Sequence, residues 1–194
     1  MRTDYVPKEL LTRLLEALTP QNALVMELCM VTGMRVGDAL MVTDESARSL
    51  AARKRKTVRY KYTEKKTGKE RTVSVPRELF ERALEQHRPE SPWLFSGVDP
   101  QKHRTRQAVW KDLHRAAKLY RVNGKRLRAR IGPHTARKVY AVDLYRKTAK
   151  KGIEDPLEAV KANLNHTDLA VTYIYALADE ITARKSRTKS SRAG

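Results

Sequence analysis

The sequence predicts a mainly α-helical domain with one small antiparallel β-sheet, and two observations carry this prediction. Apolar side chains recur at helical spacing through most of the chain, first in PKELLTRLLEAL (residues 7–18), whose five leucines can share one face. The period then changes, because TVRYKYT (57–63) and RTVSVP (71–76) alternate apolar with polar side chains, as half-buried strands do. The two runs flank a short turn, so we expect them to pair as a hairpin.

Two further helices are expected before these strands. NALVMELCMV (residues 22–31) predicts an apolar helix that begins at the cap residue Asn22 and ends near Gly33. A shorter helix follows over residues 36–42. The turn between the two strands, KKTGKE, contains Gly68, which can supply the positive φ that a tight hairpin turn needs.

The second half of the chain is expected to be helical again. PWLF (residues 92–95) is a candidate for a third short strand. No repeat or interdomain linker is visible, so we expect one domain over residues 1–180. A basic tail of low hydrophobicity, residues 181–194, is expected to be loosely ordered. The further helices are predicted at residues 76–87, 104–121, 134–150 and 156–163.

The composition makes nucleic acid the expected partner. The 194 residues contain 41 Lys and Arg against 22 Asp and Glu, a formal net charge of +19. A polyanion suits such a chain best. No apolar run reaches a membrane-spanning length and no signal peptide is visible, which makes a membrane partner the weaker alternative. The single cysteine, Cys29, excludes an internal disulfide, fits a reducing compartment and is expected to pack in the core.

The positive charge is concentrated in blocks. Residues 53–71 contain ten basic and two acidic side chains, and residues 102–130 contain eleven and one. A merely solvated surface would mix the two signs, so this segregation favours a side that faces phosphates. The expected nucleic-acid contacts are eleven side chains of these blocks: Arg53, Lys54, Arg55, Lys56, Lys102, Arg104, Arg106, Lys125, Arg126, Arg128 and Arg130.

The chain shows no metal-site spacing, phosphate-cradling glycine loop or dense carboxylate cluster. One cysteine and five scattered histidines match no zinc pattern. If such a protein cleaves phosphodiesters, we expect it to do so without a metal or another cofactor. That chemistry needs a protein nucleophile, fixed cations for the phosphate charge and a proton donor for the leaving oxygen.

Two motifs place arginine beside other polar groups. TGMRVGDAL puts Arg35 at the start of a helix after a glycine turn, with Asp38 three residues later. Asp38 is expected to be structural, pairing with or orienting an arginine. PHTARKVYAVDLY places His134 and Arg137 three residues apart, on one helix face.

A third motif, LNHTDLAVTYIYA, contains His166 with Tyr175 nine residues later. Residues two apart on a helix point about 200° from each other, so only one of Tyr173 and Tyr175 can face a site there. The hairpin turn contributes a lysine, Lys66, which follows another lysine in sequence.

In these motifs the chain resembles the catalytic domain of the tyrosine recombinases, the phage integrase family. The family pattern is an arginine after a TG turn with an acidic residue three positions on, a lysine in a β-hairpin, H-x-x-R, and LGH followed nine residues later by tyrosine. Each part has a counterpart in the same order, from about residue 7 to residue 180. Asn165 replaces the usual glycine of LGH, and asparagine is the next best residue for a left-handed helix cap. The matching positions are Arg35 with Asp38, Lys66, His134, Arg137, His166 and Tyr175.

The resemblance implies a role for each position. Tyr175, selected by its spacing from His166, would attack a DNA phosphodiester, form a 3′-phosphotyrosyl link and release a 5′-hydroxyl, leaving Tyr173 for packing. Arg35 and Arg137 would bind the non-bridging phosphate oxygens, because guanidinium groups bind phosphate bidentately.

The remaining roles concern protons. Lys66 would protonate the leaving 5′-oxygen, and only the KTG register favours it over Lys65 and Lys69. His134 would assist proton transfer near the tyrosine, and His166 would hydrogen-bond the phosphate. The covalent intermediate keeps the bond energy, so no cofactor is implied.

The implied partners are double-stranded DNA and other recombinase protomers in a synaptic complex, in the cytoplasm at the nucleoid of a prokaryotic or phage- or mobile-element-bearing cell. Most family members carry a separate N-terminal DNA-binding domain, so the chain is expected to be either an excised domain or a member made of the catalytic domain alone. The alternatives are a type IB topoisomerase, a telomere resolvase, and a catalytically silent DNA-binding protein or directionality factor. The aromatic side chains expected in the core are Trp93, Trp110 and Tyr120.

Overall fold

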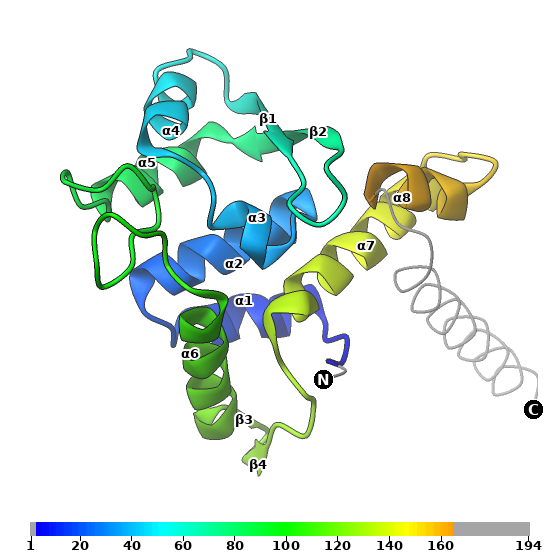
Figure 1. Cartoon of the computed structure of the whole chain (residues 1–194). Helices are drawn as coiled ribbons and strands as arrows, with labels where there is room; N and C mark the ends of the chain where they lie inside the picture. Colours follow the sequence, from blue (N-terminus) through cyan, green and yellow to red (C-terminus); the bar gives the residue numbers. More distant parts are fainter. Residues whose placement is uncertain (1–2, 165–194) are drawn as a thin grey trace, which may run out of the picture. The chain divides into compact units, whose positions relative to one another are not determined.

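A computed structural model describes residues 3–164 and confirms a mainly helical fold with a small antiparallel sheet (Figure 1). The chain divides into two compact units between Tyr140 and Ala141. The expected end of the catalytic domain at residue 180 lies outside the described residues. The first unit contains α1 (Lys8–Leu15), α2 (Pro20–Thr32), α3 (Val36–Ala39), α4 (Asp44–Ala51), β1 (Thr57–Thr63), β2 (Glu70–Pro76), α5 (Arg77–Glu85), α6 (Arg106–Leu119), β3 (Arg121–Val122), β4 (Lys125–Arg126) and the start of α7 (Pro133–Lys150).

The predicted hairpin forms as expected. β1 pairs antiparallel with β2, with Thr57 opposite Pro76 and Thr63 opposite Glu70. Along both strands buried and exposed side chains alternate, because one face packs on the helices and the other faces solvent. Gly68 has a φ of 67°, the positive value predicted for the turn.

The second helix starts earlier than predicted. α2 begins at Pro20 behind the cap residue Thr19, and not at Asn22. Proline suits the first helical position, since its φ is already helical and it has no N–H to satisfy. The Asn22 side chain instead points into the protein, where it donates to Asp112 over 2.7 Å. The predicted stop is confirmed, because Gly33 closes the helix in the left-handed conformation, with a φ of 70°.

Two elements were not predicted. Helix α4 has Thr43 as its N-cap residue, whose hydroxyl accepts a hydrogen bond from the Ser46 N–H. The short β3–β4 hairpin turns at Asn123 and Gly124, which both have positive φ, as expected for an Asn-Gly hairpin turn. The predicted third strand at residues 92–95 is reduced to an isolated bridge between Trp93 and Thr43.

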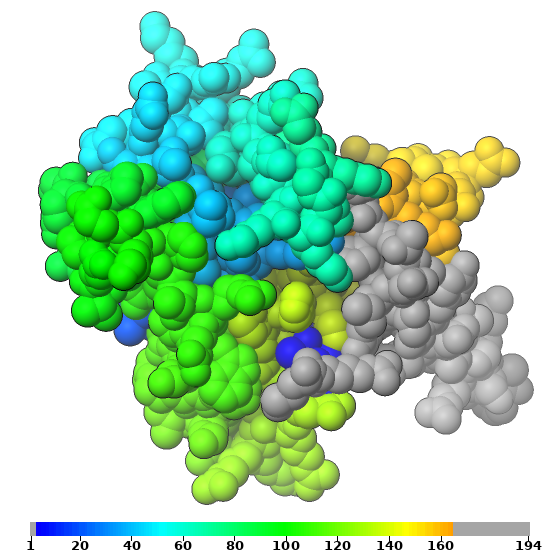
Figure 2. Space-filling model, viewed as in Figure 1, coloured from blue at the N-terminus to red at the C-terminus, as the bar shows by residue number. Residues whose placement is uncertain are grey.

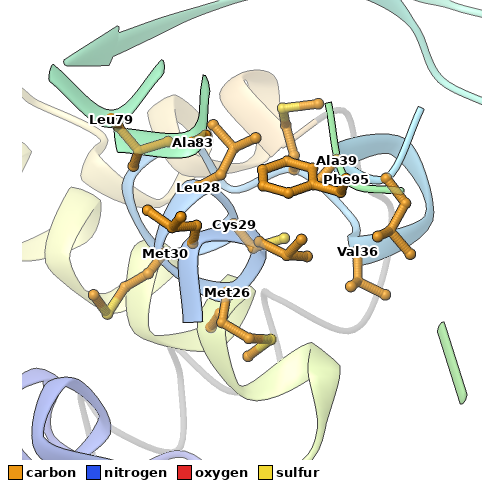
Figure 3. Packing of buried hydrophobic residues seen from close by; sticks show 14 of the residues in the cluster. Met26, Leu28, Cys29, Met30, Val36, Ala39, Leu79, Ala83 and Phe95 are labelled. Atoms are coloured by element: carbon orange, nitrogen blue, oxygen red, sulfur yellow. The ribbon is translucent and has the colours of Figure 1, made fainter. Parts of the chain in front are cut away.

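The core of the first unit is built around α2, which packs against α1, α3, α5 and β2. Figure 3 shows Met26, Leu28 and Cys29 of this helix among buried side chains that include Phe95. Cys29 is fully buried, and burial raises the pKa of its thiol to about 12, which keeps it protonated and unreactive. The packing role predicted for this cysteine is confirmed.

The aromatic residues are less buried than predicted. Trp110 is 38% exposed and lies against the His114 ring, so its prediction as a core residue is wrong. It faces outward from α6, whose buried face is formed by Val109, Leu113 and Ala116. Tyr120 is half-buried and packs against the core cluster, and Trp93 is also half-buried.

A buried carboxylate joins α6 to the start of α2. Asp112 accepts hydrogen bonds from the Thr19 N–H at 2.8 Å, the Thr19 hydroxyl at 2.9 Å and Asn22 at 2.7 Å. Arg115 donates to its other oxygen at 2.6 Å. Burial raises the pKa of Asp112, but hydrogen bonds from Asn22, Thr19 and Arg115 outweigh burial and hold it at about 2.

We expect Asp112→Ala to destabilise the protein by about 3 kcal/mol, since buried donors lose their acceptor. Because the folded-state pKa of Asp112 lies below its ordinary 3.8, the stabilisation is complete above about pH 4 and is lost as the pH falls towards 2. Urea unfolding at pH 7 and pH 3 measures both effects. Glu81→Ala removes a half-exposed partner of Arg77 and should cost at most about 1 kcal/mol. An equal loss in the two variants would contradict the role of Asp112.

The described part of the second unit is short. It contains the remainder of α7 and then α8 (Pro156–Leu164), joined through Gly152, which has a φ of 73°. Asp155 caps α8, because its Oδ1 accepts from the N–H groups of Leu157 at 3.0 Å and Glu158 at 2.8 Å. The helices predicted at residues 134–150 and 156–163 are therefore confirmed.

Candidate active site

The two predicted phosphate-binding arginines meet at the turn that ends α2. Arg35 follows this turn in extended backbone as the N-cap residue of α3, and its side chain is only 12% exposed. Arg137 lies in the first turns of α7, is buried, and donates a hydrogen bond to the carbonyl oxygen of Gly33. Because Gly33 takes the left-handed conformation, the chain can reverse there and bring Arg35 to the same region as Arg137.

A buried carboxylate, Glu64, was not predicted as part of this site. Its Oε1 lies 2.8 Å from Arg35 Nη1 and 3.1 Å from Arg71 Nη1, and its side chain is fully buried. Burial alone would raise the pKa of Glu64, but the hydrogen bond from Thr67, the ion pair with Arg35 and the hydrogen bond from Arg71 lower it below its usual value. Glu64 is therefore an anion at neutral pH and bridges two cations.

The strand pattern contained a signal for this cluster. Glu64 continues the buried face of β1 after Tyr62, and Arg71 lies on the buried face of β2 opposite Tyr62. Arg71 Nη1 donates to the Tyr62 hydroxyl at 3.1 Å. Buried charges are found almost only in pairs, so two opposite charges at one end of an apolar strand face indicate an ion pair.

Asp38 has the structural role predicted for it and also contacts the hairpin. Its Oδ1 accepts a hydrogen bond from the backbone N–H of Lys65 at 3.0 Å. Its Oδ2 lies 3.9 Å from Arg35 Nη1, an ion-pair distance too long for a hydrogen bond. Asp38 thus links the arginine helix α3 to the start of the hairpin turn.

The three candidate lysines, Lys65, Lys66 and Lys69, are all exposed in this turn. The Asp38 contact reaches the backbone immediately before Lys66, so the turn is held beside Arg35 by its main chain. A lysine side chain is long and flexible, and the assignment of the proton donor to Lys66 stays a prediction.

His134 is the second residue of α7, one turn before Arg137, and reaches solvent. Partial desolvation, together with the positive charges of Arg137, Lys138, Arg35 and Arg106, lowers its pKa below the ordinary 6.5. The imidazole is therefore neutral at pH 7 and able to accept a proton. The start of α7 is anchored by Thr135, whose hydroxyl accepts from Gly132 N–H at 3.1 Å and donates to the Asp4 carbonyl at 3.3 Å.

Arg137 keeps its charge in this crowded setting. Burial and the neighbouring charges of Arg35 and Arg71 lower its pKa to about 10, while Glu64 and Tyr62 act in the opposite direction. At pH 7 its guanidinium is fully protonated. Three arginines, Arg35, Arg71 and Arg137, thus lie near two buried carboxylates, Glu64 and Asp38, an excess of positive charge suited to an incoming anion.

Arg106 extends the positive cluster. Its Cδ lies 3.5 Å from the point that a Cβ on Gly37 would occupy, so it lies over the start of α3. It is exposed at the first position of α6 and is among the charges that lower the pKa of His134. It had been predicted only as a general nucleic-acid contact.

The other predicted basic contacts divide into two groups. Most are exposed, in the α4–β1 loop that projects in cyan in Figure 2 and in and after the β3–β4 hairpin. Arg104 instead donates to Asn22 at 2.6 Å and Gln21 at 2.9 Å, and burial lowers its pKa. Arg130 pairs with Asp4 at 3.2 Å. These two side chains hold parts of the protein together.

His166 and Tyr175 lie outside the described residues, so their places in the site remain predictions. Within residues 3–164 no group of three His, Cys, Asp or Glu side chains could hold a metal ion. No helix of that part of the chain is long and apolar enough to cross a membrane.

The fold and this charge cluster define the class of protein: a tyrosine recombinase catalytic domain, mainly helical, with lysines in the turn of the β1–β2 hairpin. The chain belongs to the phage integrase family, whose sequence profile matches residues 5–180. No curated protein is significantly similar to it in sequence.

Solved structures share the fold. The XerH site-specific recombinase bound to a palindromic difH substrate superposes with a TM-score of 0.62 at 22% identity, over 88% of this chain and 48% of that one. The Tn1549 transposon integrase, in complex with a circular intermediate DNA, gives 0.62 at 13% identity, over 89% and 62%. The catalytic domain of bacteriophage HP1 integrase gives 0.54 at 19% identity, over 90% and 88%. The chain therefore spans about half the length of XerH.

Proposed function

We propose that this chain is a DNA strand transferase, the catalytic domain of a site-specific recombinase that cuts and rejoins double-stranded DNA through a 3′-phosphotyrosyl intermediate. One observation carries the proposal: Arg137 donates to the Gly33 carbonyl, two residues before Arg35, and the charge of Arg35, which pairs with Glu64, lowers the pKa of Arg137, although the two arginines are about 100 residues apart in sequence. Two fixed guanidinium groups at one point are what a pentacoordinate phosphate needs for its non-bridging oxygens.

The proposed reaction is a transesterification. The Tyr175 oxygen attacks the phosphorus, its proton passes to a base, and the bond from phosphorus to the 5′-oxygen breaks. Lys66 gives its proton to that leaving oxygen, and His166 hydrogen-bonds the phosphate. His134, neutral at pH 7, is available to take the tyrosine proton. Attack by a 5′-hydroxyl from a second strand reverses these steps and rejoins the DNA.

The surface chemistry supports a duplex partner. The α4–β1 loop and the β3–β4 hairpin expose cations that suit phosphate contacts. No Asp or Glu occurs between Asp112 and Asp143, so the residues around the β3–β4 hairpin include no acidic side chain. Recombination requires two DNA sites, so further protomers would join the complex, in the cytoplasm at the nucleoid.

The test is a nicked suicide substrate, from which the short 5′-hydroxyl fragment diffuses away after cleavage. We expect a covalent protein–DNA adduct that resists denaturation and forms at the same rate in excess EDTA, because arginine and lysine supply the positive charge. A strict requirement for magnesium in this step would overturn the mechanism. DNA binding without any adduct would favour the silent DNA-binding alternative.

A substrate with a better leaving group should restore the adduct rate of a variant that lacks Lys66. We expect Lys66→Ala to slow adduct formation by about 10²-fold or more, as loss of a general acid does. A substrate with sulfur at the 5′-bridging position needs no proton to leave, so it should restore most of the rate. The measurement compares both substrates for Lys66→Ala, Lys65→Ala and Lys69→Ala. Rescue of a different variant would assign the general acid to that lysine.

A further inference from the structure

We infer that Glu64 is a positioning residue that couples the phosphate-binding Arg35 to the hairpin turn carrying the proton donor. The inference rests on the proposed function and adds to it a residue outside the family motif. Glu64 would touch no reacting atom, because its side chain is fully buried and paired with Arg35 and Arg71.

The first half of the coupling is the ion pair with Arg35. Oε1 of Glu64 lies 2.8 Å from Arg35 Nη1 and 3.1 Å from Arg71 Nη1. Among the described residues, the ion pair of Arg35 with Glu64 is shorter than its ion pair with Asp38, which measures 3.9 Å. A guanidinium has five N–H donors, so one nitrogen can be held by Glu64 while others remain for a phosphate. Arg71 shares the carboxylate and fixes it from the opposite strand.

The second half is the turn itself, which Glu64 also closes. Its Oε2 accepts from the Thr67 hydroxyl at 2.7 Å, and its carbonyl oxygen accepts from Gly68 N–H at 2.8 Å. Its own N–H donates to the Lys69 carbonyl at 2.9 Å. Glu64 precedes Lys66 and these three partners follow it, so contacts of Glu64 close the turn around Lys66. One residue thus sets both the Arg35 guanidinium and the backbone that carries Lys66.

This arrangement has a functional consequence. The guanidinium binds the phosphate and the lysine protonates an oxygen of that same phosphate, so their relative placement matters to a fraction of an ångström. A flexible hairpin turn would not hold such a placement. A buried anion with partners on both sides makes the two groups move together.

The experiment compares Glu64→Gln with Glu70→Gln, a matched control in the same hairpin. Glu70 pairs with Lys61 on the surface, where both side chains are more than 60% exposed. We expect Glu64→Gln to slow adduct formation at saturating DNA by about 10- to 100-fold, and Glu70→Gln by less than about twofold. DNA affinity should stay within about threefold in both, because Glu64 is buried. Equal adduct rates for wild type and Glu64→Gln would overturn the inference.

A second variant covers the possibility that Glu64→Gln unfolds. Thr67 is exposed, and Thr67→Val keeps its shape while removing the hydroxyl that holds Oε2. This variant loses only the contact that holds the turn carrying Lys66, and it keeps the ion pair with Arg35. The 5′-bridging sulfur substrate, which needs no proton donor, should therefore restore the adduct rate of Thr67→Val, as for Lys66→Ala. A Thr67→Val rate equal to wild type on the oxygen substrate, or one slowed equally on both substrates, would contradict the coupling. Absence of any adduct with wild-type protein would instead contradict the proposed function.

Discussion

Tyr175→Phe should abolish the covalent adduct on the suicide substrate. The substitution removes one hydroxyl, and that oxygen is the proposed nucleophile, so no alternative attacking group remains. DNA binding should change by no more than about 1 kcal/mol, the usual worth of one neutral hydrogen bond. The measurement is a denaturing gel for the adduct beside a gel shift for binding.

Tyr173→Phe is the matched control, since it makes the same chemical change two residues away. It should retain the adduct, because two residues so spaced cannot face the same site if the sequence forms the helix expected there. If Tyr173→Phe were inactive and Tyr175→Phe active, the register predicted from His166 would be wrong and Tyr173 would be the nucleophile.

Arg35→Ala and Arg137→Ala should each reduce the adduct rate at saturating DNA by about 10²- to 10³-fold, or about 2.7–4 kcal/mol of transition-state stabilisation. This value is the typical cost of deleting one preorganised donor to a developing oxyanion. Arg137→Ala should also lower the melting temperature, because its side chain donates to the Gly33 carbonyl and is buried. Single-turnover kinetics separate the chemical step from binding.

Arg48→Ala is the control for these two variants. Arg48 pairs with Asp44 on the exposed face of α4, where its side chain is 58% exposed. Its loss should change the rate by less than about twofold, since exposed pairs of this kind contribute little. A loss of DNA affinity without any loss of rate in Arg35→Ala would show that Arg35 only binds the duplex.

Local patterns were sufficient for most of the fold. The alternation in residues 57–63 and 71–76 predicted the hairpin because one sheet face is buried and the other is not. Gly33 and Gly68 were recognised because few other residues tolerate a positive φ. The Asn22 cap was wrong for a tertiary reason: its side chain is used by Asp112, ninety residues away, and Thr19 with Pro20 begins the helix.

The sequence by itself determined the fold class, the family motif and the positive charge of the expected partner surface. These features depend on the periodicity of apolar residues, on the spacing within short motifs and on composition, all of which can be determined from the sequence without a structure. Only the tertiary structure decided that Glu64 and Arg71 belong with Arg35 and Arg137, because burial and ion pairing join residues distant in sequence. It also decided that Arg104 holds Asn22 within the protein, since charge alone cannot distinguish a buried contact from an exposed one.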